Sequence, residues 1–258
     1  MPRVTVERDG HVLVIGLDRP DKRNAADWAM LQELALAYAE LDRDPELRVG
    51  LVHAHGEHFT AGLDLADVMP RLGPDGLDVV PAGGLNPWQV EGRSVTKPVV
   101  VAVQGICLTL GIELALAADV VVAADSARFA QIEVGRGILP FGGATIRFPR
   151  LGWGDAMRWI LTGDTFDAAE AHRIGLVQEV VPHGEQFARA REIAGRIAAQ
   201  APLAVQSALA NARLAQREGA AAAEARLQPE LVRLAASEDA AIGLRAFLAR
   251  ETAQFIGR

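Results

Sequence analysis

The apolar segment at residues 98–118 constrains the fold of this chain more than any other part of the sequence. The β-branched runs Val99–Val103 and Val120–Ala124 are typical of short buried strands, and residues 110–118 between them have the composition of a helix. A strand, a helix and a second strand in this order predict a right-handed parallel crossover. The fold class expected from this segment is therefore α/β.

The N-terminal residues predict a hairpin and a helix. Residues 4–7 and 12–17 flank Asp9-Gly10, and β-branched runs on both sides of such a turn dipeptide are typical of a β-hairpin. Apolar side chains at helical spacing predict a helix over residues 25–41, ending before Asp44-Pro45.

The rest of the chain divides into strands, one loop and a helical tail. Short apolar runs predict strands at residues 49–53 and 177–181. Proline and glycine punctuate residues 66–96, which we interpret as a loop or partial lid. From Glu185 onward the chain is alanine-rich with helical periodicity, broken at Pro202 and Gly219. Its apolar stripes fit packing on another subunit and burial within the same chain equally well.

Composition excludes several classes of function. The net charge of -7 argues against a general surface for nucleic acid or anionic membranes, because phosphates attract basic patches. A transmembrane helix at residues 98–118 is disfavoured by Gln104, Gly105 and Glu113. Cys107 is the only cysteine, so no internal disulfide can form and a cytoplasmic location is expected.

Two glutamates are the first candidates for chemistry. Glu113 is the only charged residue between Lys97 and Asp119, and Glu133 lies among apolar residues before a glycine-rich turn. A buried carboxylate is costly to ionise, so it is expected to be neutralised, hydrogen-bonded or used in proton transfer. The structural alternatives are a buried Glu113 satisfied by an arginine or a backbone group, and a surface Glu133 near a strand end. If the two carboxyls converge, they can divide acid and base duties.

A small-residue turn follows a predicted strand twice in the sequence. The first is the segment FTAGLDL at residues 59–65, and a similar arrangement recurs at residues 105–114, just before and around Glu113. Backbone N–H groups exposed at such turns can stabilise an oxyanion. The alternative for the first turn is a plain helix start with Asp64 as N-cap.

Neither the three closely spaced histidines nor the glycine-containing segments indicate another function. His53, His55 and His58 end an apolar strand with no cysteine or acidic ligand beside them, so no metal is expected. The sequence contains no nucleophile elbow, P-loop or dinucleotide-binding glycine fingerprint.

Several segments together resemble the crotonase family, the enoyl-CoA hydratase/isomerase superfamily, over nearly the whole chain. The stretches that carry the resemblance are RPDKRNA, FTAGLDL, VQGICLTLGIELALAADVVVA, FAQIEVGRGILPFGG, LTGDTFDAAEAHRIGLVQEVV and GLRAFLARE. The resemblance implies a spiral core of repeated β-β-α units with an acyl-CoA site over residues 1–195. It also implies a C-terminal helical oligomerisation region at residues 196–258, which forms trimers or hexamers.

The resemblance also assigns roles to residues. The thioester oxygen would be bound by the backbone N–H groups of Leu63 and Leu110, with Glu113 activating water and Glu133 delivering a proton. The activity implied is hydration of 2-enoyl-CoA to 3-hydroxyacyl-CoA, with coenzyme A as part of the substrate and no metal or redox cofactor. The residues implied in coenzyme A binding are Arg23, Ala25, Ala61, Leu63, Asp64 and Leu65.

This chain departs from the family pattern in two places. Leu108-Thr109-Leu110-Gly111 stands where many members have a glycine-rich run, and Ala66 stands where some hydratases have a lysine near the CoA phosphates. Arg23, Arg71 or a C-terminal arginine of a neighbouring subunit would then compensate for the lysine. Two other functions stay open: double-bond isomerisation or another enolate-forming acyl-CoA reaction, and a non-catalytic scaffold that binds CoA or RNA.

Overall fold

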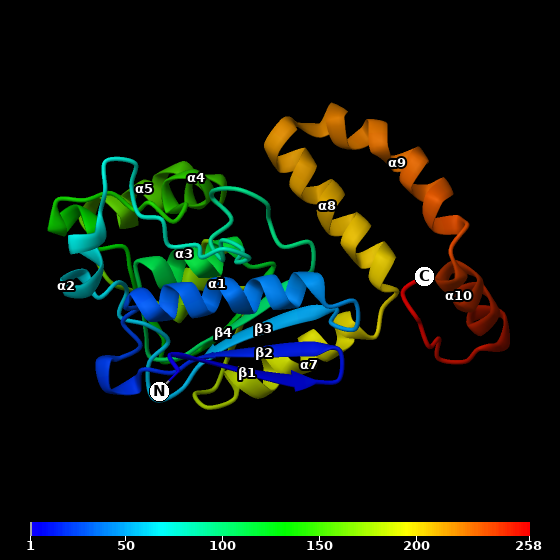
Figure 1. Ribbon diagram of the computed structural model, residues 1–258, viewed down its shortest axis with the longest axis horizontal. Coiled ribbons are helices and arrows are strands. Elements are labelled where there is room, and N and C mark those ends of the chain that lie inside the picture. Colours follow the sequence, from blue (N-terminus) through cyan, green and yellow to red (C-terminus); the bar gives the residue numbers. More distant parts are fainter. Residues whose placement is uncertain (1) are drawn as a thin grey trace.

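A mostly parallel six-stranded sheet forms the centre of the molecule in the computed structural model, which describes residues 2–258 (Figure 1). The strand order is β1-β2-β3-β4-β6-β9, with only the β1–β2 hairpin antiparallel. The strands are β1 (Val4–Asp9), β2 (Val12–Leu17), β3 (Val49–Ala54), β4 (Val99–Val103), β6 (Val120–Ala124) and β9 (Glu179–Val181). The α/β expectation and the predicted hairpin are confirmed.

Helices cover both faces of this sheet, which explains why β4 and β6 are apolar at every position. In β2, Leu13 and Ile15 face the core that contains α1 (Trp28–Arg43). Val12 and Val14 face the second core, which contains α7 (Gln186–Ala198). Because successive strand residues point to opposite faces, a strand covered on both sides needs no polar alternation.

A second, three-stranded sheet has the order β5-β7-β8. Its strands are β5 (Ile106–Leu108), β7 (Arg128–Ala130) and β8 (Phe166–Asp167). Two successive turns of the chain each give one strand to each sheet: β4 and β6 are parallel neighbours in the large sheet, and β5 and β7 are parallel neighbours in the small one. The segment that follows β3 joins the small sheet through the isolated bridge between Thr60 and Cys107 of β5. These repeated turns place the starts of successive helices beside one another.

Helix α1 begins at Trp28, so the predicted start at residue 25 is wrong. Asp27 caps the helix by accepting a hydrogen bond from Met30 N–H, and its backbone is extended. The preceding Ala26 is held in a bridge with Leu63, where its N–H donates to Gly62 O at 2.8 Å. The helix also continues beyond residue 41, to Arg43.

Among the other predicted elements, the largest differences concern the last strand and the segment 66–96. The last strand begins at Glu179 rather than residue 177, because Val177 N–H bonds Ala171 O and not the sheet. The segment 66–96 is a loop over most of its length, but its start contains helix α2 (Leu65–Val68) and a 3-10 turn at Met69–Arg71.

Three further helices follow α7 and extend away from the sheet (Figure 1). They are α8 (Pro202–Glu218), α9 (Ala220–Ala235) and α10 (Glu238–Ala249). Pro202 is the first residue of α8 and Gly219 separates α8 from α9, so both predicted breaks are confirmed. The division at residues 195/196 stays a prediction and falls within α7. None of the helices in residues 2–258 combines the length and apolar character needed to cross a bilayer.

Candidate active site

Two neighbouring turns of the spiral bring residues 59–64 and 106–110 side by side. Thr60 N–H donates to Ile106 O at 3.1 Å, and Leu108 N–H donates to Thr60 O at 3.0 Å. These bonds hold the FTAGLDL turn against the strand that leads into α3 (Leu110–Ala117). The two turns that resemble one another in sequence are therefore in register in space.

Gly62 makes the close approach of the turns possible. Its φ is +97°, a left-handed conformation that L side chains rarely adopt, and a Cβ at this position would collide with Thr109 Oγ1. Thr109 itself has a φ of 50° and immediately precedes α3. The peptide groups that follow these two residues are those of Leu63 and Leu110.

The backbone N–H groups of Leu63 and Leu110 are left without an acceptor in these turns. Leu110 is the first residue of α3, so its N–H has no intrahelical acceptor. In the bridge between Ala26 and Leu63, the hydrogen bonds run from Ala26 N–H to Gly62 O and from Asp64 N–H to Ala26 O, which turns Leu63 N–H away from Ala26. Neither amide donates to an acceptor within residues 2–258.

Glu113 lies in the first turn of α3 with only 2% of its surface exposed. Its Oε1 accepts a hydrogen bond from Ala144 N–H at 3.0 Å. Burial raises the pKa of this carboxyl to about 7, and the backbone N–H groups of Ala144, Gly142 and Gly143 oppose the rise. The structural alternative of a backbone partner for Glu113 is thus correct, and it coexists with a strongly shifted pKa.

Glu133 begins a 3-10 turn, Glu133–Arg136, and is 5% exposed, so the alternative of a surface glutamate is wrong. Its Oε1 accepts a hydrogen bond from Gln131 Nε2 at 3.3 Å, while Oε2 is buried and has no partner within residues 2–258. Burial raises the pKa of Glu133 to about 7, and the charge of Glu113 raises it further. The two carboxyls are therefore close enough for the charge of one to affect the pKa of the other.

The turn after Glu133 packs directly on Glu113. A Cβ at Gly142 would lie 2.5 Å from Glu113 Oε2 and 3.1 Å from Cδ1 of Trp88. Trp88 in turn donates its indole N–H to Leu110 O at 3.0 Å. Helix α4 (Ala144–Arg147) begins directly after this turn. Trp88 and Ala144 were not among the predicted site residues.

The residues predicted to contact coenzyme A gather at one edge of these turns. Ala61 N–H donates to Arg23 O at 2.9 Å. The Nη1 group of Arg19 donates both to Ala25 O and to Asp64 Oδ2, at 2.9 and 2.8 Å. Leu65 is the first residue of α2. Leu63 joins the same edge through its bridge with Ala26.

Asp64 occupies the N-cap position of α2, yet its carboxylate makes no capping bond. The hydrogen bond from Arg19 is the main cause that lowers the pKa of Asp64. Arg71 lies nearby, with its guanidinium 5.2 Å from the centre of a Trp28 ring. Arg19 was missed by the sequence reasoning because its partners lie across the turn.

The histidines do not form a metal centre, and within residues 2–258 no group of three histidine, cysteine or acidic side chains is arranged to hold an ion. The rings of His53 and His55 pack edge to face, 4.9 Å apart. Burial lowers the pKa of His53 to about 4.

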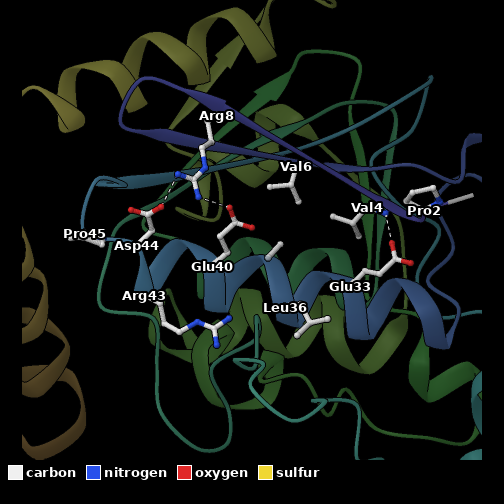
Figure 2. Close-up of a pocket in the computed structure, with 11 residues that line it drawn as sticks. Pro2, Val4, Val6, Arg8, Glu33, Leu36, Glu40, Arg43, Asp44 and Pro45 are labelled. Carbon is white, nitrogen blue, oxygen red and sulfur yellow. Dashed lines mark hydrogen bonds and ion pairs between the residues drawn. The ribbon is translucent and has the colours of Figure 1, made fainter.

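A separate groove of about 730 Å³ lies between β1 and α1 (Figure 2). Arg8 spans it to reach Glu40 and Asp44, at 2.9 and 2.7 Å. Val6 and Leu36 line its apolar part. None of the predicted site residues borders this groove, so it is distinct from the site at Glu113 and Glu133.

Comparisons with known proteins agree over the full length. The family model "Enoyl-CoA hydratase/isomerase" matches residues 7–258. Enoyl-CoA hydratase EchA19 of Mycobacterium tuberculosis is 34% identical over 264 residues, covering 100% of this chain and 97% of the relative.

Solved structures are similar over the same extent. The crystal structure of a probable enoyl-CoA hydratase/isomerase from Mycobacterium abscessus has a TM-score of 0.96 and 60% identity, covering 99% of each chain. The structure of an enoyl-CoA hydratase from Mycobacterium tuberculosis H37Rv has a TM-score of 0.91 and 35% identity, covering 100% of each chain.

Proposed function

The chain belongs to the enoyl-CoA hydratase/isomerase, or crotonase, family of enzymes that act on acyl-CoA, and from that premise we propose that it hydrates 2-enoyl-CoA to 3-hydroxyacyl-CoA. The observation that carries the proposal is the interaction of two buried carboxyls, Glu113 and Glu133, each with a pKa raised to about 7. Glu113 lies in the helix that begins at Leu110, and Glu133 lies on the following turn of the chain, after β7.

In the proposed reaction, the thioester oxygen accepts hydrogen bonds from Leu63 N–H and Leu110 N–H. Attack on C3 moves electron density onto this oxygen, so the donors stabilise the enolate-like transition state more than the substrate. The bulky side chain at Leu110 does not change this role, since the donor is a backbone group.

The two glutamates supply the proton transfers. Glu113 takes a proton from water, whose oxygen bonds C3, and Glu133 gives a proton to C2, so that one water is added across the double bond. A pKa near neutrality suits both roles, because one carboxyl must be ionised while the other is protonated. Repulsion between the two negative charges favours the state in which only one of the two carboxyls is ionised.

The test replaces each glutamate by its amide. Glu113→Gln and Glu133→Gln are each expected to lower kcat for 2-enoyl-CoA hydration by about 10²- to 10⁴-fold, the usual contribution of a positioned acid or base. Glu224→Gln removes the same charge from an exposed position on α9 and serves as the matched control. Undiminished turnover in either site variant would end the proposal.

Isomerisation of 3-enoyl-CoA is the second candidate, because Glu133 keeps one carboxylate oxygen without a hydrogen bond and could carry a proton between two carbons. The same pair of amides would stabilise the enolate of that reaction. Side-by-side assays of 3-enoyl and 2-enoyl thioesters separate the two, and dominant turnover of the 3-enoyl thioester would favour the isomerase. Absence of turnover with both, together with salt-sensitive RNA binding, would favour the scaffold.

We also propose that coenzyme A binds along the edge formed by Arg23, Ala25, Ala61, Leu63, Asp64 and Leu65. The ion pair between Arg19 and Asp64 supports this assignment, because it fixes the turn from which Leu63 donates. Arg71, whose guanidinium lies over Trp28, is the residue proposed to neutralise a phosphate in place of the lysine replaced by Ala66.

A homotrimer or hexamer is the proposed assembly. Helices α9 and α10 carry large apolar side chains that are more than half exposed in the single chain, a pattern typical of a protein–protein interface. They are Leu227, Leu231, Val232, Leu244, Phe247 and Leu248.

A further inference from the structure

The guanidinium of Arg147, at the end of α4, lies on the loop that also holds Glu113. Its Nη2 donates a hydrogen bond to Gln89 O at 3.0 Å. Its Nη1 is buried and has no hydrogen-bond partner within residues 2–258. A Cβ at Gly143 would collide with this same Nη1, so glycine gives the guanidinium its place over the turn. Arg147 thus has a buried donor group directed at no protein acceptor.

Residues 88–90 run along α3 and connect the oxyanion end of the site with Arg147. Trp88 bonds Leu110 O, at the start of α3, and Gln89 Nε2 donates to Ala117 O at 2.8 Å, at its end. Cγ1 of Val90 would lie 2.8 Å from a Cβ at Gly143. Residues 88–90 therefore contact both the start of α3, at the predicted donor Leu110, and the turn at Gly143 that carries the Arg147 guanidinium.

The charged groups around Arg147 leave its guanidinium without a permanent acidic partner. Burial lowers its pKa, Arg150 and Arg213 act in the same direction, and Glu113 is the one acid that opposes them. Arg213 already binds both carboxylate oxygens of Asp119, at 3.0 and 3.2 Å. Glu113 is the residue proposed to exchange protons during turnover. Arg147 is a half-buried cation, and the acid nearest in effect, Glu113, alternates between charged and neutral forms. An anionic group of the ligand would therefore stabilise the guanidinium.

We propose that Arg147 determines specificity by binding a carboxylate at the far end of the acyl chain, so that ω-carboxyacyl-CoA thioesters are preferred over methyl-ended ones. The inference rests on the proposed function for the direction of the substrate, with the thioester at Leu63 and Leu110 and the chain passing Trp88 and Val90. The guanidinium fork then meets the carboxylate with Nη1, which has no other acceptor.

The kinetic test compares pairs of 2-enoyl-CoA thioesters that have four, six or eight acyl carbons and end in either a carboxylate or a methyl group. The ratio of kcat/KM within each pair measures recognition of the end group. For the best-matched length, Arg147→Gln is expected to lower the carboxylate-to-methyl ratio by about tenfold to a hundredfold, the range for a hydrogen bond to a charged group.

Two variants make the comparison specific. Arg147→Lys keeps the charge without the planar fork and is expected to retain part of the preference. Arg150→Gln removes the same charge from an exposed position three residues away and should keep most of the ratio. Loss of Arg147 also affects Glu113, but that effect acts on both members of a pair and cancels in the ratio.

A binding experiment separates this inference from the proposed reaction. Saturated acyl-CoA thioesters with carboxylate or methyl ends have no double bond to hydrate, so calorimetric titration of them reports recognition alone. Tighter binding of the carboxylate-ended thioester to the unaltered protein, lost in Arg147→Gln, supports the inference even if hydration is absent. Equal binding of both thioesters to the unaltered protein, or an equal loss of both in Arg147→Gln, would overturn it. Circular dichroism melting of each variant checks that it is folded.

Discussion

The backbone N–H of Ala144 donates a hydrogen bond to Oε1 of Glu113 at 3.0 Å, which joins the start of α4 to the first turn of α3. This contact orients the carboxyl with a neutral donor and not with a fixed positive charge. A full ion pair would hold the pKa of Glu113 low, whereas the N–H groups of residues 142–144 and the charge of Arg147 leave the effect of burial dominant. Proton exchange near neutral pH is thus compatible with a fixed carboxyl position.

Replacing Gly142 by alanine should disturb Glu113 without removing any polar group. The new Cβ would lie 2.5 Å from Glu113 Oε2, so the carboxyl must move. We expect kcat for hydration to fall about tenfold or more and stability to fall by about 1–3 kcal/mol, as for other overpacked sites. Steady-state kinetics and thermal melting measure the two effects.

Gly154→Ala is the matched control for that prediction, because a Cβ there meets nothing within 4 Å. Unchanged kcat in Gly142→Ala would show that the position of Glu113 is not critical.

Stability should fall as pH rises through the window set by the buried glutamates. The folded-state pKa of Glu113 is about 7, against 4.5 for an ordinary glutamate, so the folded protein binds more protons than the unfolded chain between these values. The stabilisation is complete below pH 4.5 and is lost as pH approaches about 7. Because a unit of pKa corresponds to about 1.4 kcal/mol, the loss for this residue is of the order of 3–4 kcal/mol.

Glu113→Gln removes the ionisation and should therefore melt at a higher temperature than the unaltered protein at pH 8. Near pH 4.5 the two should melt at similar temperatures, since both side chains are neutral there. Melting curves at the two pH values measure the difference, and an advantage of the variant that does not grow with pH would contradict the raised pKa.

Activity should follow a bell-shaped pH profile. Hydration as proposed needs one of Glu113 and Glu133 ionised and the other protonated, and both have a pKa of about 7. We expect kcat/KM to reach its maximum near neutral pH and to decrease on both sides as the pair becomes doubly protonated or doubly ionised. A flat profile between pH 5 and 9, measured with a substrate that binds equally throughout, would argue against paired acid and base duties.

Gly62→Ala should separate the two turns of the proposed oxyanion site. The variant combines a left-handed φ of +97° with a collision against Thr109 Oγ1. We expect kcat/KM to fall about a hundredfold, comparable to loss of one oxyanion donor. The double variant Gly62→Ala/Thr109→Ala relieves the collision but not the backbone strain, so it should recover part of the loss.

Kinetics of the two single variants and the double variant give the coupling between the positions. If Thr109→Ala recovers nothing in the Gly62→Ala background, the close contact of the two turns is not what positions the donors.

Charge on α10 should break the proposed assembly. Phe247 and Leu248 are 79% and 73% exposed in the single chain, so Phe247→Glu/Leu248→Glu is expected to lower the mass of the particle to that of one chain. Arg245→Glu, on the same helix and also exposed, is the control and should preserve the assembly. Sedimentation velocity measures the mass, and a single-chain mass for the unaltered protein would contradict the proposed trimer or hexamer.

The strands of the large sheet could be predicted from the sequence because the residues that determine each strand are adjacent in the chain. Val99–Val103 and Val120–Ala124 are strands with the predicted bounds, since uninterrupted β-branched runs suit strands buried on both faces. The strands of the small sheet have at most three residues each, too few for any periodicity, and they were not predicted. Their pairing depends on partners in other turns of the spiral.

Tertiary contacts also explain the errors near the site. The start of α1 was placed too early because Ala26 has good helix propensity, yet its N–H is held by Gly62 from a later segment. The lone charge of Glu113 in an apolar run did indicate burial. The burial of Glu133 had no such local signal, and the hydrogen bond from Ala144 depends on how the turn at Gly142 folds back.

Trp88 gives this protein a built-in optical probe. The indole is 5% exposed, is anchored on Leu110 O, and lies against the glycine turn that holds Glu113. With Trp28, Trp153 and Trp159 replaced by phenylalanine, emission from the remaining indole should report binding at the proposed site directly, so that unlabelled thioesters can be titrated by fluorescence.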